Sequence, residues 1–298
     1  ILENVSLAGE RGIPCIDIGK KCNVNLQITG ENELRTGGIR VPDSSVLTVV
    51  GDGNLTINLN SGKYFGIGNS LDEYHGELNF YQDGGIIINA NGMKGIGIGS
   101  GLGGVINIKR GHYEFDMKGQ EGACIGSVNG DSELFIEYCD MDIYSGISNG
   151  TIIGSVNGDA DIKLENISAK LQGAGNIITG IGTIAGNSCI VRLENVNISS
   201  NIRAKECYGI GCRAGRTNIY IGYAAVKSVV QGKAAVAFGN SVMSAKLYCS
   251  NADIGTNAVT EFNSDIGALE KNIQLENGRA EFILNGQEVK RQILAARL

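Results

Sequence analysis

A short segment around one of the two histidines collects the residue types that acid–base chemistry requires. Residues 70–77 read Ser-Leu-Asp-Glu-Tyr-His-Gly-Glu, so three carboxylates lie close to His75 in the sequence. Carboxylates beside a histidine can transfer protons or hold a metal ion. The second histidine, His112, lies near Glu114 and Asp116, but the repeat described below puts it on a different side of the molecule. We predict an ordinary polar loop with no catalytic residue and no metal, and keep a polysaccharide lyase or glycoside hydrolase using this loop as an alternative.

Two series of side chains recur at an interval of about 28 residues and have the types that bind sugars. The first series is aromatic and basic and comprises Phe135, Lys163, Arg192, Tyr220 and Tyr248. The second lies two residues further on and comprises Glu137, Glu165, Glu194, Gly222 and Ser250. Rings stack on sugars and polar groups bond their hydroxyls, so we predict a carbohydrate-binding groove for a linear glycan, with an anionic one as an option. The simpler interpretation is a solvated strand face with Lys–Glu and Arg–Glu pairs.

Two Asn-Gly-Asp turns offer oxygen atoms that a cation could use. They occupy residues 129–131 and 157–159, and the same interval separates them. Ca²⁺ needs about six to eight oxygens, whereas the neighbouring turns offer Gly104, Asn187 and Arg216. We therefore predict tight turns without a metal. The many Gly-X-Gly strings predict no nucleotide cofactor, because no helix follows them to hold a phosphate.

The eight cysteines contain no Cys-X-X-Cys pair, which disfavours zinc-knuckle and thioredoxin-like sites. Several fall at core positions of the repeat, where a free thiol behaves as a small apolar group. We expect most of them to be reduced, which suits a cytoplasm or the surface of an anaerobe. Whether Cys207 and Cys212, the closest pair, form a disulfide is left open.

The composition narrows the class of protein. The 298 residues include 45 glycines, 2 prolines and no tryptophan, with 42% hydrophobic and 19% charged residues. This hydrophobic content argues against disorder, and no run of roughly 18 apolar residues predicts a membrane span. The net charge of −6 and the scattered lysines and arginines disfavour nucleic acid as a partner.

A repeated tag, an apolar residue followed by glycine, organises the chain. Its central residues are Ile39, Ile67, Ile96, Ile125, Ile153, Ile181, Ile210, Phe238 and Ile266. From Ile67 onward, the interval between successive tags varies by no more than a single position. The heptapeptide Ile-Gly-Ser-Val-Asn-Gly-Asp occurs identically at residues 125–131 and 153–159. Repeats of this kind indicate a stack of similar structural units.

Apolar residues alternate within each repeat in a pattern typical of strands with one buried face. Each repeat offers three short strands, with a corner at positions such as Asn166 and Asn195, and shows no helical spacing. We predict an all-β parallel β-helix of about nine coils of about 28–29 residues, in which each coil contacts only its neighbours. A β-propeller is disfavoured because its blades need about 40–45 residues.

The two ends depart from the pattern. Pro14 to Ile28 resembles a first, irregular coil, and Asn285-Gly286 indicates a turn after a last strand at residues 281–284. Residues 287–298 contain helix formers with Val289, Ile293 and Leu294 on one face. We therefore divide the chain into a β-helix domain at residues 1–286 and a helical cap or linker at residues 287–298.

The N-terminal motifs carry a resemblance to a known family. They are Pro-Cys-Ile-Asp-Ile-Gly at residues 14–19, Asn-Val-Asn-Leu-Gln-Ile-Thr-Gly-Glu-Asn at 23–32, Gly-Ile-Arg-Val-Pro at 38–42, Leu-Thr-Val at 47–49 and Gly-Asp-Gly-Asn-Leu-Thr-Ile at 51–57. With the tags, they resemble right-handed parallel β-helix proteins of the pectate-lyase-like superfamily, of the bacterial surface carbohydrate-binding type. The resemblance implies a right-handed β-helix and binding of sugar polymers outside a bacterial cell, and no catalytic motif of that superfamily matches a position in this chain.

We therefore expect a non-catalytic module that binds a polysaccharide or other glycan, or acts as an adhesin, without cofactor and without membrane insertion. The expected location is outside or on the surface of a bacterial cell, although the free cysteines leave a cytoplasmic location open. Besides the enzyme, the alternative is a structural stalk or fibre segment that binds a protein partner.

Overall fold

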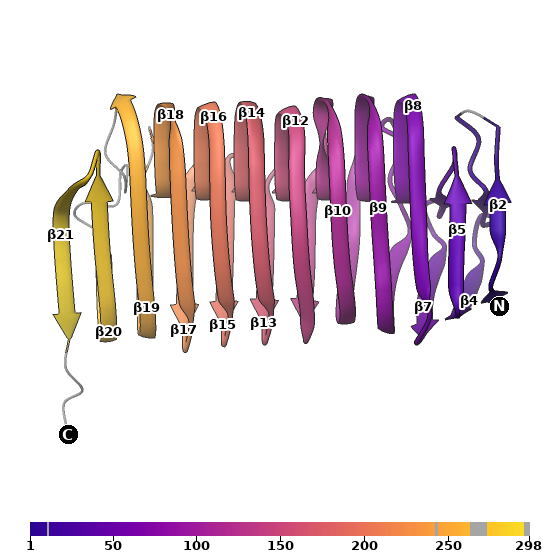
Figure 1. The fold of residues 1–298 in the computed structure, drawn as a ribbon, viewed down its shortest axis with the longest axis horizontal. Helices are drawn as coiled ribbons and strands as arrows, with labels where there is room; N and C mark the ends of the chain where they lie inside the picture. The colour runs from indigo at the N-terminus through magenta and orange to yellow at the C-terminus, as the bar shows by residue number, and fades with distance from the viewer. Residues whose placement is uncertain (11, 242–243, 263–272, 295–298) are drawn as a thin grey trace.

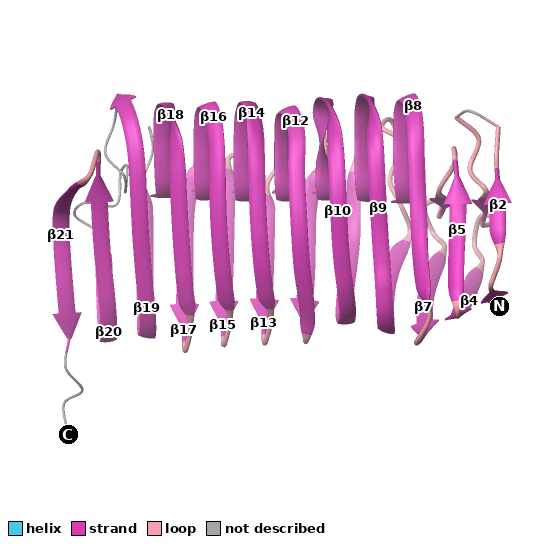
Figure 2. Cartoon of the chain, viewed as in Figure 1, coloured by secondary structure: helices cyan, strands magenta, loops and turns pink. Residues whose placement is uncertain are grey.

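The molecule is a single rod of stacked strands. The computed structural model describes residues 1–298 apart from residues 11, 242–243, 263–272 and 295–298. In this part of the chain every regular element is a β-strand (Figure 2), and there is no helix that could cross a membrane. The strands lie side by side, with the first and last strands at opposite ends (Figure 1). The predicted all-β parallel β-helix is confirmed, with about ten turns instead of nine.

The first coils are built from seven short strands and the longer strand β8. These are β1 (Leu2–Glu3), β2 (Ser6–Ala8), β3 (Ile16–Asp17), β4 (Asn23–Thr29), β5 (Glu31–Arg35), β6 (Ile39–Arg40), β7 (Val46–Gly51) and β8 (Asn54–Gly68). The parallel pairs β1–β4 and β4–β7 form one side of the rod, and β2–β5 and β5–β8 form another. The first coil thus begins at Leu2, before the Pro14 segment that the sequence suggested.

Long strands dominate the middle of the rod. They are β9 (Glu77–Ser100), β10 (Gly103–Ser127), β12 (Cys139–Ser155), β14 (Ser168–Thr183), β16 (Asn197–Cys212) and β18 (Ala225–Gly239). Between them lie the short strands β11 (Asp131–Glu137), β13 (Ala160–Glu165), β15 (Ser188–Glu194) and β17 (Arg216–Gly222). Two of the three predicted strands of a central coil are therefore joined, because the backbone keeps pairing with its neighbours through the bend between them.

A column of apolar side chains forms the centre of the core. It runs Ile39, Ile67, Ile98, Ile125, Ile153, Ile181, Ile210 and Phe238, all fully buried and in register from coil to coil. The sequence analysis placed Ile96 in this column and is wrong by two residues, because the loop at residues 69–76 lengthens that coil. Ile96 packs instead in a second, smaller cluster with Leu71.

The glycine after each column residue has a steric reason. Gly126, Gly154 and Gly182 have φ angles of 130°, 133° and 135°, which residues other than glycine rarely adopt. A Cβ atom at Gly154 would also collide with the carbonyl oxygen of Gly182 in the next coil. The tag therefore marks a position where the backbone of the next coil leaves no room for a side chain.

The predicted corner at Asn166 and Asn195 is present. Both residues have positive φ angles, 54° and 51°, and the side-chain amide of Asn195 donates a hydrogen bond of 2.5 Å to Asn166 Oδ1. Tyr138 and Tyr223 occupy the same corner in neighbouring coils with φ angles of 53° and 46°. The backbone thus turns here in the left-handed region, which asparagine adopts more readily than most residues.

The C-terminal end differs from the prediction. The last strands are β19 (Ala245–Phe262), β20 (Ile273–Leu284) and β21 (Gln287–Leu294). The expected helix is wrong, because β21 pairs antiparallel with β20 through a two-residue Asn285-Gly286 turn with positive φ at both residues. The predicted tag at Ile266 lies outside the described residues.

Candidate functional site

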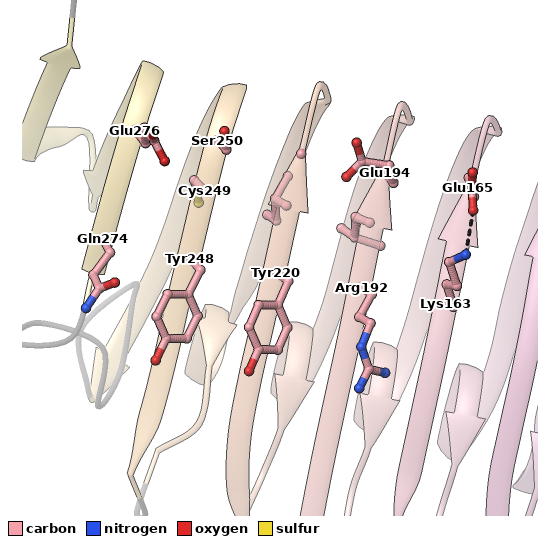
Figure 3. A pocket seen from close by; sticks show the side chains of 13 residues that line it. Lys163, Glu165, Arg192, Glu194, Tyr220, Tyr248, Cys249, Ser250, Gln274 and Glu276 are labelled. Atoms are coloured by element: carbon pink, nitrogen blue, oxygen red, sulfur yellow. Dashed lines mark ion pairs between the residues drawn. The ribbon is translucent and has the colours of Figure 1, made fainter.

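The two predicted series of side chains border one hollow on the C-terminal half of the rod. It has a volume of about 910 Å³ and lies over β13, β15, β17, β19 and β20 (Figure 3). We call it the groove. Its lining comprises Lys163, Glu165, Arg192, Leu193, Glu194, Tyr220, Ile221, Gly222, Tyr248, Cys249, Ser250, Gln274 and Glu276.

One side of the groove is the aromatic and basic series. Lys163, Arg192, Tyr220 and Tyr248 follow each other in register from coil to coil, and Gln274 continues the series. The rings of Tyr220 and Tyr248 stack in parallel, with centroids 5.0 Å apart and planes 6° apart. The Arg192 guanidinium lies 6.0 Å from the Tyr220 ring centroid on the neighbouring strand. Figure 3 shows the two tyrosine hydroxyls and the Arg192 guanidinium pointing the same way, whereas Lys163 turns towards Glu165.

The other side of the groove is the carboxylate series. Glu165, Glu194, Gly222, Ser250 and Glu276 follow each other in register on successive strands. The two small residues leave space between two carboxylates. A Cβ atom at Gly222 would meet the carboxylate of Glu194, so the glutamate side chain lies over the glycine. The hollow thus lies where Gly222 and Ser250 take the place of longer charged residues in the series.

Both basic groups of the groove are already engaged by carboxylates. Lys163 Nζ lies 2.6 Å from Glu165 Oε2, and Arg192 forms an ion pair with Asp161. The pKa of Lys163 is raised, first by its hydrogen bond to Glu165 and further by the negative charges of Glu137 and Glu194. Within the described part of the chain, neither Glu194 nor Glu276 takes part in an ion pair. The lining consequently carries an excess of negative charge.

The structure brings together six of the eight predicted site residues. Phe135 and Glu137 are in register with Lys163 and Glu165 but lie on the preceding coil, outside the lining, and Glu137 pairs with Lys109. The sequence analysis missed Gln274 and Glu276. Tyr248 pairs with Gln274 after a shorter interval than in the other coils, so a constant interval skips the aromatic series and lands on Glu276.

The histidine loop does not gather its groups at one point. His75 is buried, its Nδ1 donates to the Gly76 carbonyl, and burial lowers its pKa to about 4. Its carboxylate neighbours have separate partners, namely Lys63 for Asp72, Arg40 for Glu73 and Asn79 for Glu77. His112 is exposed on β10. Among the described residues no group of three or more His, Cys, Asp or Glu could hold a metal ion.

The two Asn-Gly-Asp turns stack as predicted and use their carboxylates structurally. Asp131 Oδ1 accepts a 2.9 Å hydrogen bond from the backbone N–H of Asp159. Asp159 Oδ1 in turn accepts from the N–H groups of Asn187 and Ser188, at 2.7 and 3.0 Å. The hydroxyl of Ser155 donates to the Gly130 carbonyl from inside. These contacts account for the acidic residues of the turns without a cation.

All eight cysteines are free, and six of them are buried. Cys207 and Cys212 form no disulfide. Burial raises the pKa of Cys124 and of Cys207 to about 12, so both remain protonated thiols near neutral pH. The buried cysteines therefore pack as core residues, as expected.

The fold places the chain in the class of parallel β-helix proteins, which is the fold of the superfamily that its motifs resemble. No protein-family model matches the chain, and neither a curated protein nor a solved structure does. The groove is consequently the feature of the molecule that bears on its function.

Proposed function

We propose that this protein is a non-catalytic module that binds a linear glycan in the groove over β13, β15, β17, β19 and β20. The observation that carries the proposal is the stacked pair Tyr220 and Tyr248 beside an open hollow of about 910 Å³. The resemblance of the N-terminal motifs to bacterial surface proteins supports a location at a bacterial surface.

The groove supplies the two kinds of contact that sugars need. The tyrosine rings offer apolar surface with polar hydroxyls, and Tyr220 is 40% exposed. Carboxylates and the Ser250 hydroxyl can bond sugar hydroxyls on the opposite side. The strand ladder and the ring stack hold these groups in place before a ligand arrives, which lowers the entropic cost of binding.

The repeat of the coils suits a polymer. Equivalent side chains on neighbouring strands are about 4.8 Å apart along the rod, so the groove presents similar contacts at regular steps. A linear chain of sugars lying along the rod meets one side chain from each of the two series at every coil. A compact small molecule would use only part of this length.

The test is a glycan array carrying plant pectins, cellulose, mucin glycans and bacterial wall polymers. We expect binding to one polymer class, and a loss of about 30-fold in affinity when Tyr220→Ala and Tyr248→Ala are combined. The control is Tyr81→Ala, because Tyr81 is also 40% exposed but lies on β9, away from the groove. Its removal should leave binding unchanged.

Two outcomes contradict the proposal. One is silence of the whole array for a protein whose circular dichroism shows a folded β structure. The other is binding that survives in the double tyrosine variant. The first outcome would favour a structural stalk or a protein-binding module, and the second would place the bound glycan away from the tyrosine pair.

A further inference from the structure

The charges around the groove point to the kind of sugar that it takes. The lining holds two cations, Lys163 and Arg192, and each already has a carboxylate partner, Glu165 and Asp161 respectively. Glu194 and Glu276 remain without an ion pair among the described residues. Among the described residues, a bound anion would therefore meet two carboxylates outside any ion pair, and cations that are both already paired.

These two carboxylates stand at the ends of the gap left by the small residues of their series. Glu194, Gly222, Ser250 and Glu276 lie on four successive strands, so their backbones span three strand steps. Three steps at about 4.8 Å put the Cα atoms of Glu194 and Glu276 roughly 14 Å apart along the rod, and the Glu194 carboxylate lies closer than that to Glu276, because it reaches over Gly222. The gap lies beside the stacked tyrosines (Figure 3).

We infer that the groove selects a linear glycan whose sugars carry protonated amines. This inference rests on the proposed function and replaces the anionic polymer that the sequence analysis allowed. Amines of a sugar chain lying along the gap pair with Glu194 and Glu276, while its rings contact Tyr220 and Tyr248. Charge complementarity selects this class against carboxylated and sulfated polymers, since like charges brought together cost binding energy.

A basic peptide carries the same charge but fits the surface less well. An extended peptide gains much of its affinity by adding a strand to a free sheet edge. The strands β13, β15, β17 and β19 each pair on both sides, so their backbone groups are already used. Of the described strands under the groove, only β20 keeps a stretch of edge, at residues 273–277, that its pairing with β21 does not cover, which is a short edge for an extended peptide. A sugar chain has no need of these groups, because it binds through side chains alone.

The experiment compares soluble oligomers of equal length by isothermal titration calorimetry. The probes are oligomers of glucosamine, of N-acetylglucosamine and of galacturonic acid, and a lysine-rich peptide. The pH lies below the pKa of the sugar amine and above the ordinary glutamate value of about 4.3. We expect the glucosamine oligomer to bind most tightly, with an affinity that falls as salt is added.

The decisive variant combines Glu194→Gln and Glu276→Gln. It should weaken binding of the glucosamine oligomer about tenfold, and leave the N-acetylated oligomer within about twofold of the unmodified protein. The matched control combines Glu114→Gln and Glu133→Gln, two exposed glutamates on β10 and β11 that line no part of the groove. It should bind all probes as the unmodified protein does.

The outcomes separate this inference from the proposed function. Equal or tighter binding of the N-acetylated or acidic oligomer, lost in the double tyrosine variant, overturns the charge preference and leaves glycan binding intact. A lysine-rich peptide that binds as tightly as the glucosamine oligomer overturns the sugar as ligand. Silence of all sugar probes, and of the whole array, overturns both proposals.

Discussion

At the scale of the residue, one hydrogen atom in place of a side chain decides whether two coils can stack. Gly154 has a φ of 133°, and a Cβ atom there would strike the Gly182 carbonyl. We expect Gly154→Ala to lower the free energy of unfolding by at least about 2 kcal/mol, because strained backbone adds to the collision. The measurement is the urea midpoint at constant slope.

The control for this variant is Gly255→Ala on β19, where no atom lies within 4 Å of an added Cβ. Its free energy of unfolding should change by less than about 1 kcal/mol. An equal loss of unfolding free energy in both variants would contradict the explanation by collision. It would show that replacing any strand glycine by alanine has this cost.

At the scale of the element, the asparagine corner ends one strand and starts the next. Asn195 turns the backbone at a φ of 51°, and its amide donates to Asn166 on the previous coil. We expect Asn195→Ala to cost about 1–2 kcal/mol, because it loses both the hydrogen bond and the tolerance of left-handed backbone. Asn195→Gly loses the hydrogen bond but keeps the tolerance of left-handed backbone, so it should lower the free energy of unfolding by less. The comparison is made by urea unfolding, and equal costs would show that the backbone conformation contributes nothing.

The elements that could be predicted from the sequence are those with a local residue signal of their own. The Asn285-Gly286 turn was visible because two positive φ angles favour that dipeptide. The helix expected after it rested on the helix formers of residues 287–298 and on Val289, Ile293 and Leu294, and over so short a segment three apolar residues fit the period of a strand as well as that of a helix. The strand forms because the edge of β20 offers unpaired backbone groups. That edge exists only in the folded rod.

The error at Ile96 has a related cause. Two Gly-Ile-Gly units overlap at residues 95–99, and only the inserted loop at residues 69–76 decides which of them stacks on Ile67. Counting residues cannot locate an insertion that shifts the register within a coil. The prediction of the groove residues failed for the same reason. The aromatic and basic series was predicted correctly as far as Tyr248 and was lost where the interval between successive coils shortens.

At the scale of the whole molecule, one buried histidine makes stability depend on pH. Burial lowers the pKa of His75 to about 4, against an ordinary value of 6.5, while its hydrogen bond to Gly76 acts in the opposite direction. The folded state therefore disfavours the protonated ring. The free energy of unfolding therefore has its full value, as far as His75 is concerned, above about pH 6.5. It falls as the pH drops from 6.5 towards 4, by about 3 kcal/mol in total.

The measurement is the free energy of unfolding across this pH window. His75→Gln should remove this part of the pH slope, whereas His112→Gln, at an exposed histidine, should retain it. Identical slopes in the two variants would assign the pH dependence to the carboxylates instead.

The two identical heptapeptides have a consequence for how the rod assembles. Ile125 to Asp131 and Ile153 to Asp159 lie on adjacent coils, and their first three residues pair with each other in register. A solenoid grows by docking each new coil onto the free edge of the previous one. Because both coils offer that edge the same heptapeptide, a coil docked one repeat too early makes the same local contacts and loops out a whole repeat. We expect this symmetry to permit docking one repeat out of place during folding, so that the residues flanking the heptapeptide have to distinguish the two positions.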